Sequence, residues 1–140
     1  HKAEFYRYGV MHRNTFINSP KLLNADFSLR ENENLFFAGQ LTGVEGYMES
    51  AASGILAGIN AVRRLNSQEP VTLPTDTMLG ALAGYISDKY VEKFQPMGAN
   101  FGVLPALENR PRDKQERGKA YSDRALKSLE AYLTHMNLEV

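Results

Sequence analysis

Three glycines after a short apolar run are the residues of this sequence whose types and spacing point most directly to chemistry. Residues 36–54 read FFAGQLTGVEGYMESAASG, with Gly39, Gly43 and Gly46 in the turn. Glycine adopts backbone angles that other residues resist, and it lets a ligand approach the main chain. The segment after Gly46 has helical spacing, so unpaired N–H groups and the positive end of a helix dipole are expected there. Such a turn attracts a phosphate or an electron-rich ring edge.

The residues alone leave the ligand of this turn open. Glu45 places a carboxylate in the first helical turn, which disfavours a simple phosphate site but suits the helix dipole. Tight packing of a strand against a helix explains the glycines equally well without a ligand. Tyr47 lies on the apolar stripe of the predicted helix, where the residues alone favour a core tyrosine.

Residues 11–14, MHRN, form a second polar group. His12 can act as an acid or a base near neutral pH, and Arg13 can bind a phosphate. A polar cluster that bridges two domains is the alternative interpretation.

Residues 110–127 form a third group, with seven basic and three acidic side chains. A basic stripe of this kind could contact nucleic-acid phosphates. A solvated helix face explains it as well.

Composition limits what the chain can be. Its 140 residues predict one domain or a piece of one, and a hydrophobic content of 43% suffices for a core. Basic and acidic residues number 16 each, which disfavours a uniformly basic nucleic-acid binder. The lack of cysteine excludes disulfides and thiol catalysis in this chain. No apolar run approaches the roughly 18 residues of a membrane span, so we expect a cytoplasmic protein without a membrane partner. The start at His1, without Met, indicates a cut from a longer protein or a tag remnant.

Periodicity predicts the elements that position these groups. Strands are predicted at 4–10, 21–29 and 35–38, the last one covered by helices on both sides, with a charged turn at 30–34. Helices are predicted at 44–65, 75–90 and 111–136, with a linker at 66–74 and an irregular or short-stranded segment at 94–107.

Details of the helices are also predicted. Thr75 or Asp76 is the expected N-cap of the second helix. Glycine inside a helix costs about 1 kcal/mol relative to alanine, so Gly54 and Gly58 should serve close packing. In the last helix the residues expected to point inward are Leu126, Leu129 and Leu133.

Five stretches occur in the same order as in one known family. They are YGVMHRNTFINSP, LFFAGQ, GQLTGVEGYMESAASGILAGINAVR, FQPMGANFG and the helix with DKQER. On these stretches essentially the whole chain resembles the last third of the folate- and FAD-dependent tRNA (uridine-54 C5) methyltransferase family. The resemblance implies an α/β fold that is the C-terminal part of a Rossmann-like FAD-binding domain, with short strands, a glycine-rich strand-to-helix turn and three helices.

The resemblance also implies roles for the glycine turn. In this family FAD carries the chemistry, methylenetetrahydrofolate supplies the carbon, NAD(P)H reduces the flavin, and tRNA is the substrate. Backbone N–H groups from Gly43 to Gly46 would stabilise negative charge on the reduced flavin, and Tyr47 resembles the tyrosine that stacks on its ring. The residues implied to bind FAD are Gly39, Gln40, Leu41, Thr42, Gly43, Val44, Glu45, Gly46 and Tyr47.

The other two polar groups take their roles from the same resemblance. His12 and Arg13 are the catalytic candidates of this chain, with Arg13 as a partner for the glutamate tail of folate. The candidates for tRNA contact are Arg112, Arg117 and Arg124. No metal site is expected.

The chain lacks parts that the family's activity needs. A Gly-x-Gly-x-x-Gly fingerprint is absent, and so are the family's catalytic cysteines. The parent is therefore expected to be a methyltransferase, whereas this piece alone is expected to be inactive and to require the missing N-terminal FAD-binding part as its partner. We expect one domain fragment, with a strand-rich segment (1–34), a flavin-contacting strand–turn–helix (35–66) and a helical extension (67–140). Exposed strand edges would favour self-association.

Two alternatives remain at the level of the sequence. The chain could be the C-terminal piece of another FAD-binding tRNA-modifying protein, of the wobble-uridine type, or a non-catalytic binding module. The Val-Glu of GVEGY and the FQPMGANFG tail favour the methyltransferase.

Overall fold

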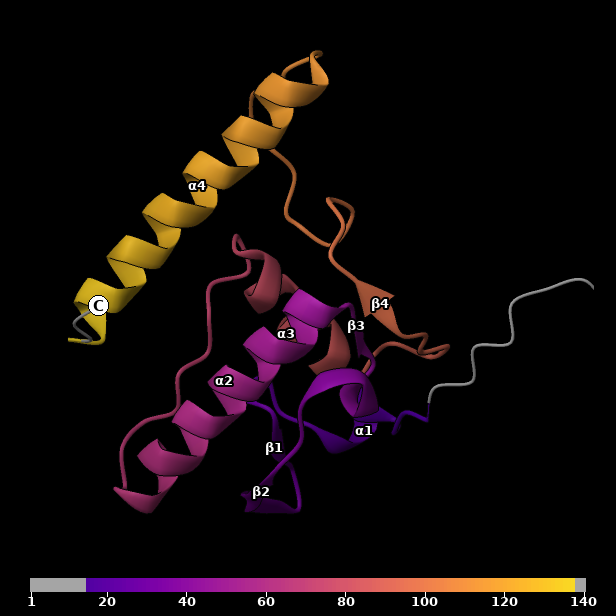
Figure 1. Cartoon of the computed structure of the whole chain (residues 1–140), viewed down its shortest axis with the longest axis vertical. Helices are drawn as coiled ribbons and strands as arrows, with labels where there is room; N and C mark the ends of the chain where they lie inside the picture. The colour runs from indigo at the N-terminus through magenta and orange to yellow at the C-terminus, as the bar shows by residue number, and fades with distance from the viewer. Residues whose placement is uncertain (1–14, 138–140) are drawn as a thin grey trace, which may run out of the picture.

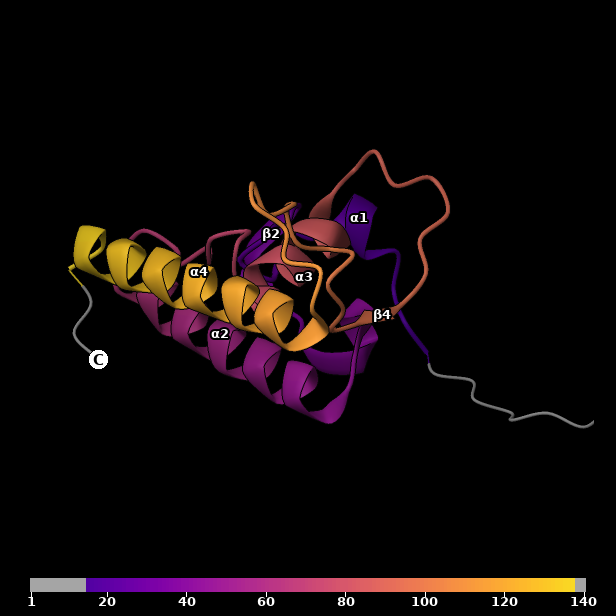
Figure 2. The same ribbon diagram turned by 90° about the horizontal axis from the view of Figure 1, so that it is seen from above.

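The computed structural model of the chain describes residues 15–137 (Figures 1 and 2). The predicted strand at 4–10 and the candidates His12 and Arg13 lie outside the described residues. The elements in chain order are α1 (Ser19–Leu22), β1 (Ser28–Leu29), β2 (Asn32–Phe36), the 3-10 turn η1 (Gly39–Thr42), β3 (Val44–Glu45), α2 (Tyr47–Leu65), α3 (Met78–Ser87), β4 (Met97–Gly98) and α4 (Lys114–His135).

The strands form two small sheets. β1 and β2 make an antiparallel hairpin, and β3 pairs with β4 in parallel, with Val44 opposite Met97. Within residues 15–137, three helices are longer than one turn. The expected α/β class with short strands, a glycine-rich turn before a helix and three helices is confirmed.

The prediction of a strand at 21–29 is wrong for most of its length. The helix α1 occupies residues 21 and 22 of this predicted strand. Pro20 in the first helical turn is compatible with a helix, because the N–H that proline lacks would have no partner inside the helix at that position. The predicted turn at 30–34 is also too long, since β2 already begins at Asn32. Leu35 is 46% exposed, so this strand is not covered on both sides.

The helix predictions hold to within a few residues. The first helix starts at Tyr47 rather than at 44, because Val44 and Glu45 pair with β4. The second helix is capped by Thr77, whose Oγ1 accepts a hydrogen bond from the Gly80 N–H at 3.1 Å. The prediction of Thr75 or Asp76 as the cap is therefore wrong. The linker at 66–74 and the irregular segment at 94–107, with its short strand β4, are confirmed.

The hydrophobic core lies between one face of α2, the helix α3 and the α1–β1 region. Its fully buried large side chains are Leu23, Phe27, Val44, Leu82 and Ile86. The packing of these side chains holds β3, and with it the end of the glycine turn, against the rest of the molecule.

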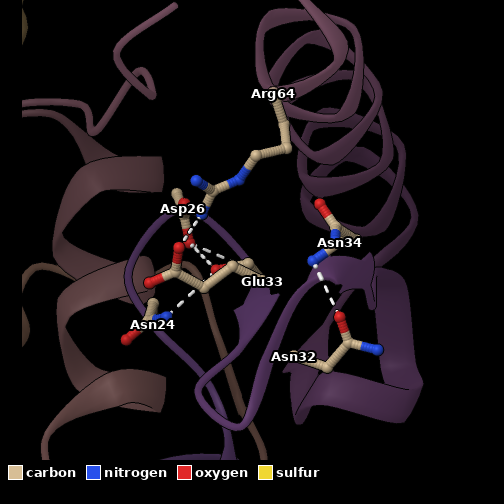
Figure 3. Close-up of polar contacts among 7 residues, drawn as sticks. Asn24, Asp26, Asn32, Glu33, Asn34 and Arg64 are labelled. Atoms are coloured by element: carbon tan, nitrogen blue, oxygen red, sulfur yellow. Dashed lines mark hydrogen bonds and ion pairs between the residues drawn. The ribbon is translucent and has the colours of Figure 1, made fainter. Parts of the chain in front are cut away.

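Polar contacts join α2 to the hairpin. The amide of Asn60, 1% exposed, donates to the carbonyls of Asp26 (3.2 Å) and Val71 (2.9 Å) and accepts from the Val71 N–H (2.7 Å). Figure 3 shows Arg64 of α2 reaching Glu33 of β2, with which it forms an ion pair. These contacts fix the direction of α2 relative to the chain segment that leads into the glycine turn.

The opposite face of α2 is apolar, and the described part of the chain leaves it exposed. The large hydrophobic residues exposed on this helix are Tyr47, Met48, Ile55, Ile59, Val62 and Leu65. A Cβ added at Gly54 or Gly58 would have no atom within 4 Å. Close packing at these glycines, as predicted, is therefore not found among the described residues.

The last helix, α4, lies on the outside of the molecule (Figures 1 and 2). It contacts the linker between α2 and α3, where Tyr132 accepts a hydrogen bond from the Thr72 N–H at 3.0 Å. Tyr121 is its one buried residue. Leu126 is 58% exposed, so its prediction as an inward residue is wrong, whereas Leu129 and Leu133 are half-buried. Among the described helices, none is long and apolar enough to cross a membrane.

Candidate cofactor-binding site

The turn from η1 into α2 requires its glycines. Gly39, Gly43 and Gly46 have φ angles of +67°, +83° and +107°, which lie in the region that side chains disfavour. A Cβ at Gly43 would overlap the ring of Phe94, and one at Gly46 would overlap the carboxylate of Glu49. A side chain at Gly43 would therefore have to displace the Phe94 ring, and one at Gly46 would displace the Glu49 carboxylate and strain the backbone at φ +107°.

Hydrogen bonds within the chain hold the first half of the turn. The Gly39 N–H donates to Ser53 Oγ (2.9 Å), and Thr42 Oγ1 donates back to the Gly39 carbonyl (2.7 Å). The Gly43 N–H donates to the Gln40 carbonyl at 2.9 Å. Thr42, Gly43 and Val44 are buried, so these three predicted cofactor residues shape the turn from inside.

The accessible residues lie at the two ends of the turn. Gln40 and Leu41 are exposed in η1, and Gly46 and Tyr47 are exposed where α2 begins, with Glu45 half-buried before them. Tyr47 is 96% exposed, so it is not the core tyrosine that the alternative interpretation required. Within residues 15–137, no side chain caps the N-terminus of α2, so its first N–H groups and the positive end of its dipole are available to a ligand.

The segment FQPMGANFG, whose role the sequence did not reveal, lies against this turn. β4 pairs with β3, and the Met97 N–H donates to the Gly43 carbonyl at 2.9 Å. Glu49 Oε1 accepts the Ala99 N–H at 3.0 Å, which ties the following loop to the first turn of α2. The strand pairing joins residues 53 positions apart in the sequence, Val44 and Met97, so the sequence pattern could not reveal it.

The three arginines predicted to contact tRNA have different surroundings. Arg112 is exposed, whereas Arg117 is half-buried and donates to the carbonyls of Pro111 and Arg112 at 3.4 and 3.3 Å. Arg124 donates to Pro105 and Ala106 and forms an ion pair with Asp76 at 3.3 Å. Its guanidinium therefore holds the 105–106 segment on α4. Among the described residues, no group of three His, Cys, Asp or Glu side chains is arranged to hold a metal ion.

The comparisons place the chain among known proteins. Residues 1–69 match the family model described as Glucose inhibited division protein A. The methylenetetrahydrofolate–tRNA-(uracil-5-)-methyltransferase TrmFO of Bacillus cytotoxicus is 56% identical over 131 residues, and that of Lactiplantibacillus plantarum is 59% identical over 130 residues. These matches cover 94% and 93% of the chain, and the chain spans 30% of the length of each relative.

A solved structure is similar to part of the chain. Aquifex aeolicus GidA, in its form II crystal, matches 56% of this chain and 13% of that protein, with a TM-score of 0.50 and 34% sequence identity. Over nearly its whole length, the chain is therefore similar to about a third of the methylenetetrahydrofolate–tRNA-(uracil-5-)-methyltransferases of these two organisms.

Proposed function

We propose that the full-length protein is an FAD-dependent enzyme that methylates C5 of uridine 54 in the T-loop of tRNA, with methylenetetrahydrofolate as the carbon donor and NAD(P)H as the reductant. This chain contributes part of the flavin site. The observation that carries the proposal is the uncapped N-terminus of α2, with an exposed tyrosine directly after the glycine turn, in a chain 55–59% identical to such methyltransferases.

The residues of the turn fit a flavin. The N–H groups at the start of α2 and the helix dipole suit the negative charge of a reduced isoalloxazine. Tyr47 offers a free ring for stacking, and Gln40 and Leu41 border the same turn. When bound, FAD would supply the relay of electrons and carbon between folate and uracil, while the residues of this chain would hold the ring and stabilise its charge.

Besides FAD, we propose that this chain contacts the N-terminal part of the same polypeptide. Each relative is more than three times as long as this chain, since the chain spans 30% of it. The apolar face of α2, with its two open glycines, is the surface on which another element of an FAD-binding domain would pack. Cytoplasmic tRNA would be the substrate of that complete protein.

A flavoprotein of the wobble-uridine type is the second candidate. It shares a glycine turn, and the structural likeness to GidA is compatible with it. The higher identity to the methyltransferases favours the first candidate.

Replacement of Tyr47 tests the proposed role of the turn. In the full-length protein, Tyr47→Ala removes a stacking partner worth about 1 kcal/mol, so methyl transfer should fall about fivefold and the flavin absorbance should shift. The melting temperature should change little, because the side chain is exposed. The matched control is Tyr90→Ala, which removes another exposed tyrosine, 80% exposed, from outside the turn. Normal methyl transfer with an unchanged flavin spectrum in Tyr47→Ala would remove the tyrosine from the site.

A further inference from the structure

A cavity of about 350 Å³ lies between the 101–106 segment and α4. Its lining includes Phe101, Leu104, Arg110, Arg117 and Tyr121. This volume is within the range of small-ligand sites, which combine apolar walls with a few placed polar groups. The cavity is separate from the exposed turn residues and shares none of the residues implied to bind FAD.

One wall of the cavity is a fixed aromatic ring. Phe101 stacks on Tyr121, with ring centroids 4.9 Å apart and an angle of 11° between the planes. Tyr121 is 8% exposed, and the guanidinium of Arg124 lies 5.2 Å from the centroid of its ring. Phe101 remains 48% exposed. The pair therefore presents an immobilised phenyl ring that is accessible to a flat ligand.

The charged groups of the cavity are two arginines. Within residues 15–137, neither Arg110 nor Arg117 forms an ion pair with a carboxylate. Arg117 uses Nη1 on two backbone carbonyls, which positions its guanidinium and leaves its other donors for a ligand. The nearby carboxylate of Asp113 accepts the N–H groups of Gln115 and Glu116 at 2.8 and 2.9 Å, so it is engaged with the start of α4. The cavity thus offers positive charge beside an aromatic ring.

The loop that carries Phe101 is anchored to the candidate flavin turn. Glu49 holds Ala99, and the Asn100 side chain closes the next turn by donating to the Gly98 carbonyl (3.0 Å) and accepting the Gly102 N–H (2.8 Å). The position of Phe101 is therefore set from the first turn of α2. A ligand in the cavity would be held in a fixed relation to the flavin turn.

We propose that this cavity binds one nucleotide of the RNA substrate, with its base on Phe101 and its phosphate at Arg110 and Arg117. Guanidinium groups match phosphate geometry, and a base stacks on an aromatic side chain whatever its sequence. The proposal rests on the proposed function, because it takes tRNA as the substrate. It assigns a place for a nucleotide outside the flavin site.

The test measures the dissociation constant of the FAD-loaded, full-length protein for an unmodified tRNA transcript at several salt concentrations. Phe101→Ala should weaken binding about tenfold without changing the salt dependence, because stacking involves no counterion. Phe101→Tyr should bind as tightly as the unsubstituted protein, since it keeps the ring.

The arginine is tested by a second pair of variants. Arg117→Gln should weaken binding and lower the slope of binding against salt concentration by about one, and Arg117→Lys should keep that slope. The control is Lys127→Gln, which removes one charge from the same helix outside the cavity and should change binding less than twofold.

The outcomes separate this proposal from the proposed function. Unchanged tRNA affinity in both Phe101→Ala and Arg117→Gln would overturn the nucleotide site. A higher KM for methylenetetrahydrofolate in these variants, with unchanged tRNA affinity, would also overturn it and assign the cavity to folate. If the unsubstituted protein methylates no tRNA but the variants lose RNA affinity as described, the proposed function fails and the nucleotide site stands.

Discussion

Glu49 joins two parts of the site that the sequence keeps far apart. The spacing of the glycines indicated a strained turn before a helix, and their positive φ angles confirm it. The sequence could not show that Glu49 would bind Ala99, because this contact depends on how two distant segments pack. For the same reason, the sequence could not predict that Tyr47 is exposed or that Thr42 and Val44 are buried.

Asp113 makes the stability of the first turn of α4 depend on pH. The hydrogen bond from the Glu116 N–H, with smaller help from Gln115, Lys114 and the charge of Arg117, holds the pKa of this carboxyl below its usual value. A lowered pKa stabilises the folded state at pH values above the unfolded pKa of about 4, and this stabilisation is lost as the pH falls through the folded value. We therefore expect the first turn of α4 to fray in acid.

Amide hydrogen exchange at Gln115 and Glu116 checks this expectation. Protection of these two amides, corrected for intrinsic exchange, should fall between about pH 6 and about pH 2. Asp113→Asn keeps a capping side chain but cannot titrate, so its protection should not depend on pH in this range. Equal protection at both pH values in the unsubstituted chain would contradict the capping role.

At the scale of elements, the sequence predicted helices better than strands. The apolar spacing that defines α2, α3 and α4 is local, so their positions were predictable to within a few residues. The strands are two to five residues long and depend on partners, as in the pairing of Val44 with Met97. A two-residue strand has too few side chains to show an alternating pattern. The sequence therefore did not predict β3, and it predicted β4 only as a possible short strand within the irregular segment at 94–107.

Two glycines inside helices should respond to alanine in opposite directions. At Gly58 a Cβ would meet open space, so Gly58→Ala should stabilise the 140-residue chain by about 0.5–1 kcal/mol through helix propensity. At Gly80 a Cβ would overlap the carbonyl of Pro74 and lie 2.6 Å from that of Leu73, so Gly80→Ala should destabilise it by about 1–3 kcal/mol. Urea unfolding of both variants measures the two changes. The packing account would be contradicted if Gly80→Ala were as stable as the unsubstituted chain.

At the scale of the whole molecule, the uncovered face of α2 is the main feature. Six large apolar side chains of one helix are exposed, which is more than a stable soluble surface commonly leaves in one place. The sequence showed the apolar stripe but could not show which side of it this chain covers. Leu56 and Ala57 are buried in the core, whereas Ile55 and Ile59 on the other side of the helix are exposed.

If the N-terminal part of the full-length protein covers this face, a charged residue there should lower the stability of the complete protein but not that of the 140-residue chain. Ile55→Glu should change the stability of the 140-residue chain by no more than about 0.5 kcal/mol, because the side chain is 66% exposed. In the full-length protein it should cost several kcal/mol, because the carboxylate would be buried without a partner. Leu126→Glu, at a 58% exposed position on α4, is the matched control and should be mild in both. Equal effects of Ile55→Glu in the two proteins would show that the face stays open.

Formation of 5-methyluridine in an unmodified tRNA transcript tests the central claim most directly. The full-length protein is incubated with FAD, methylenetetrahydrofolate and NAD(P)H, and the same protein stripped of FAD serves as the comparison. We predict 5-methyluridine at position 54 with FAD and none without it, and none from the 140-residue chain alone. An FAD-saturated protein that forms no 5-methyluridine, or a stripped protein that forms it equally well, would contradict the proposed function.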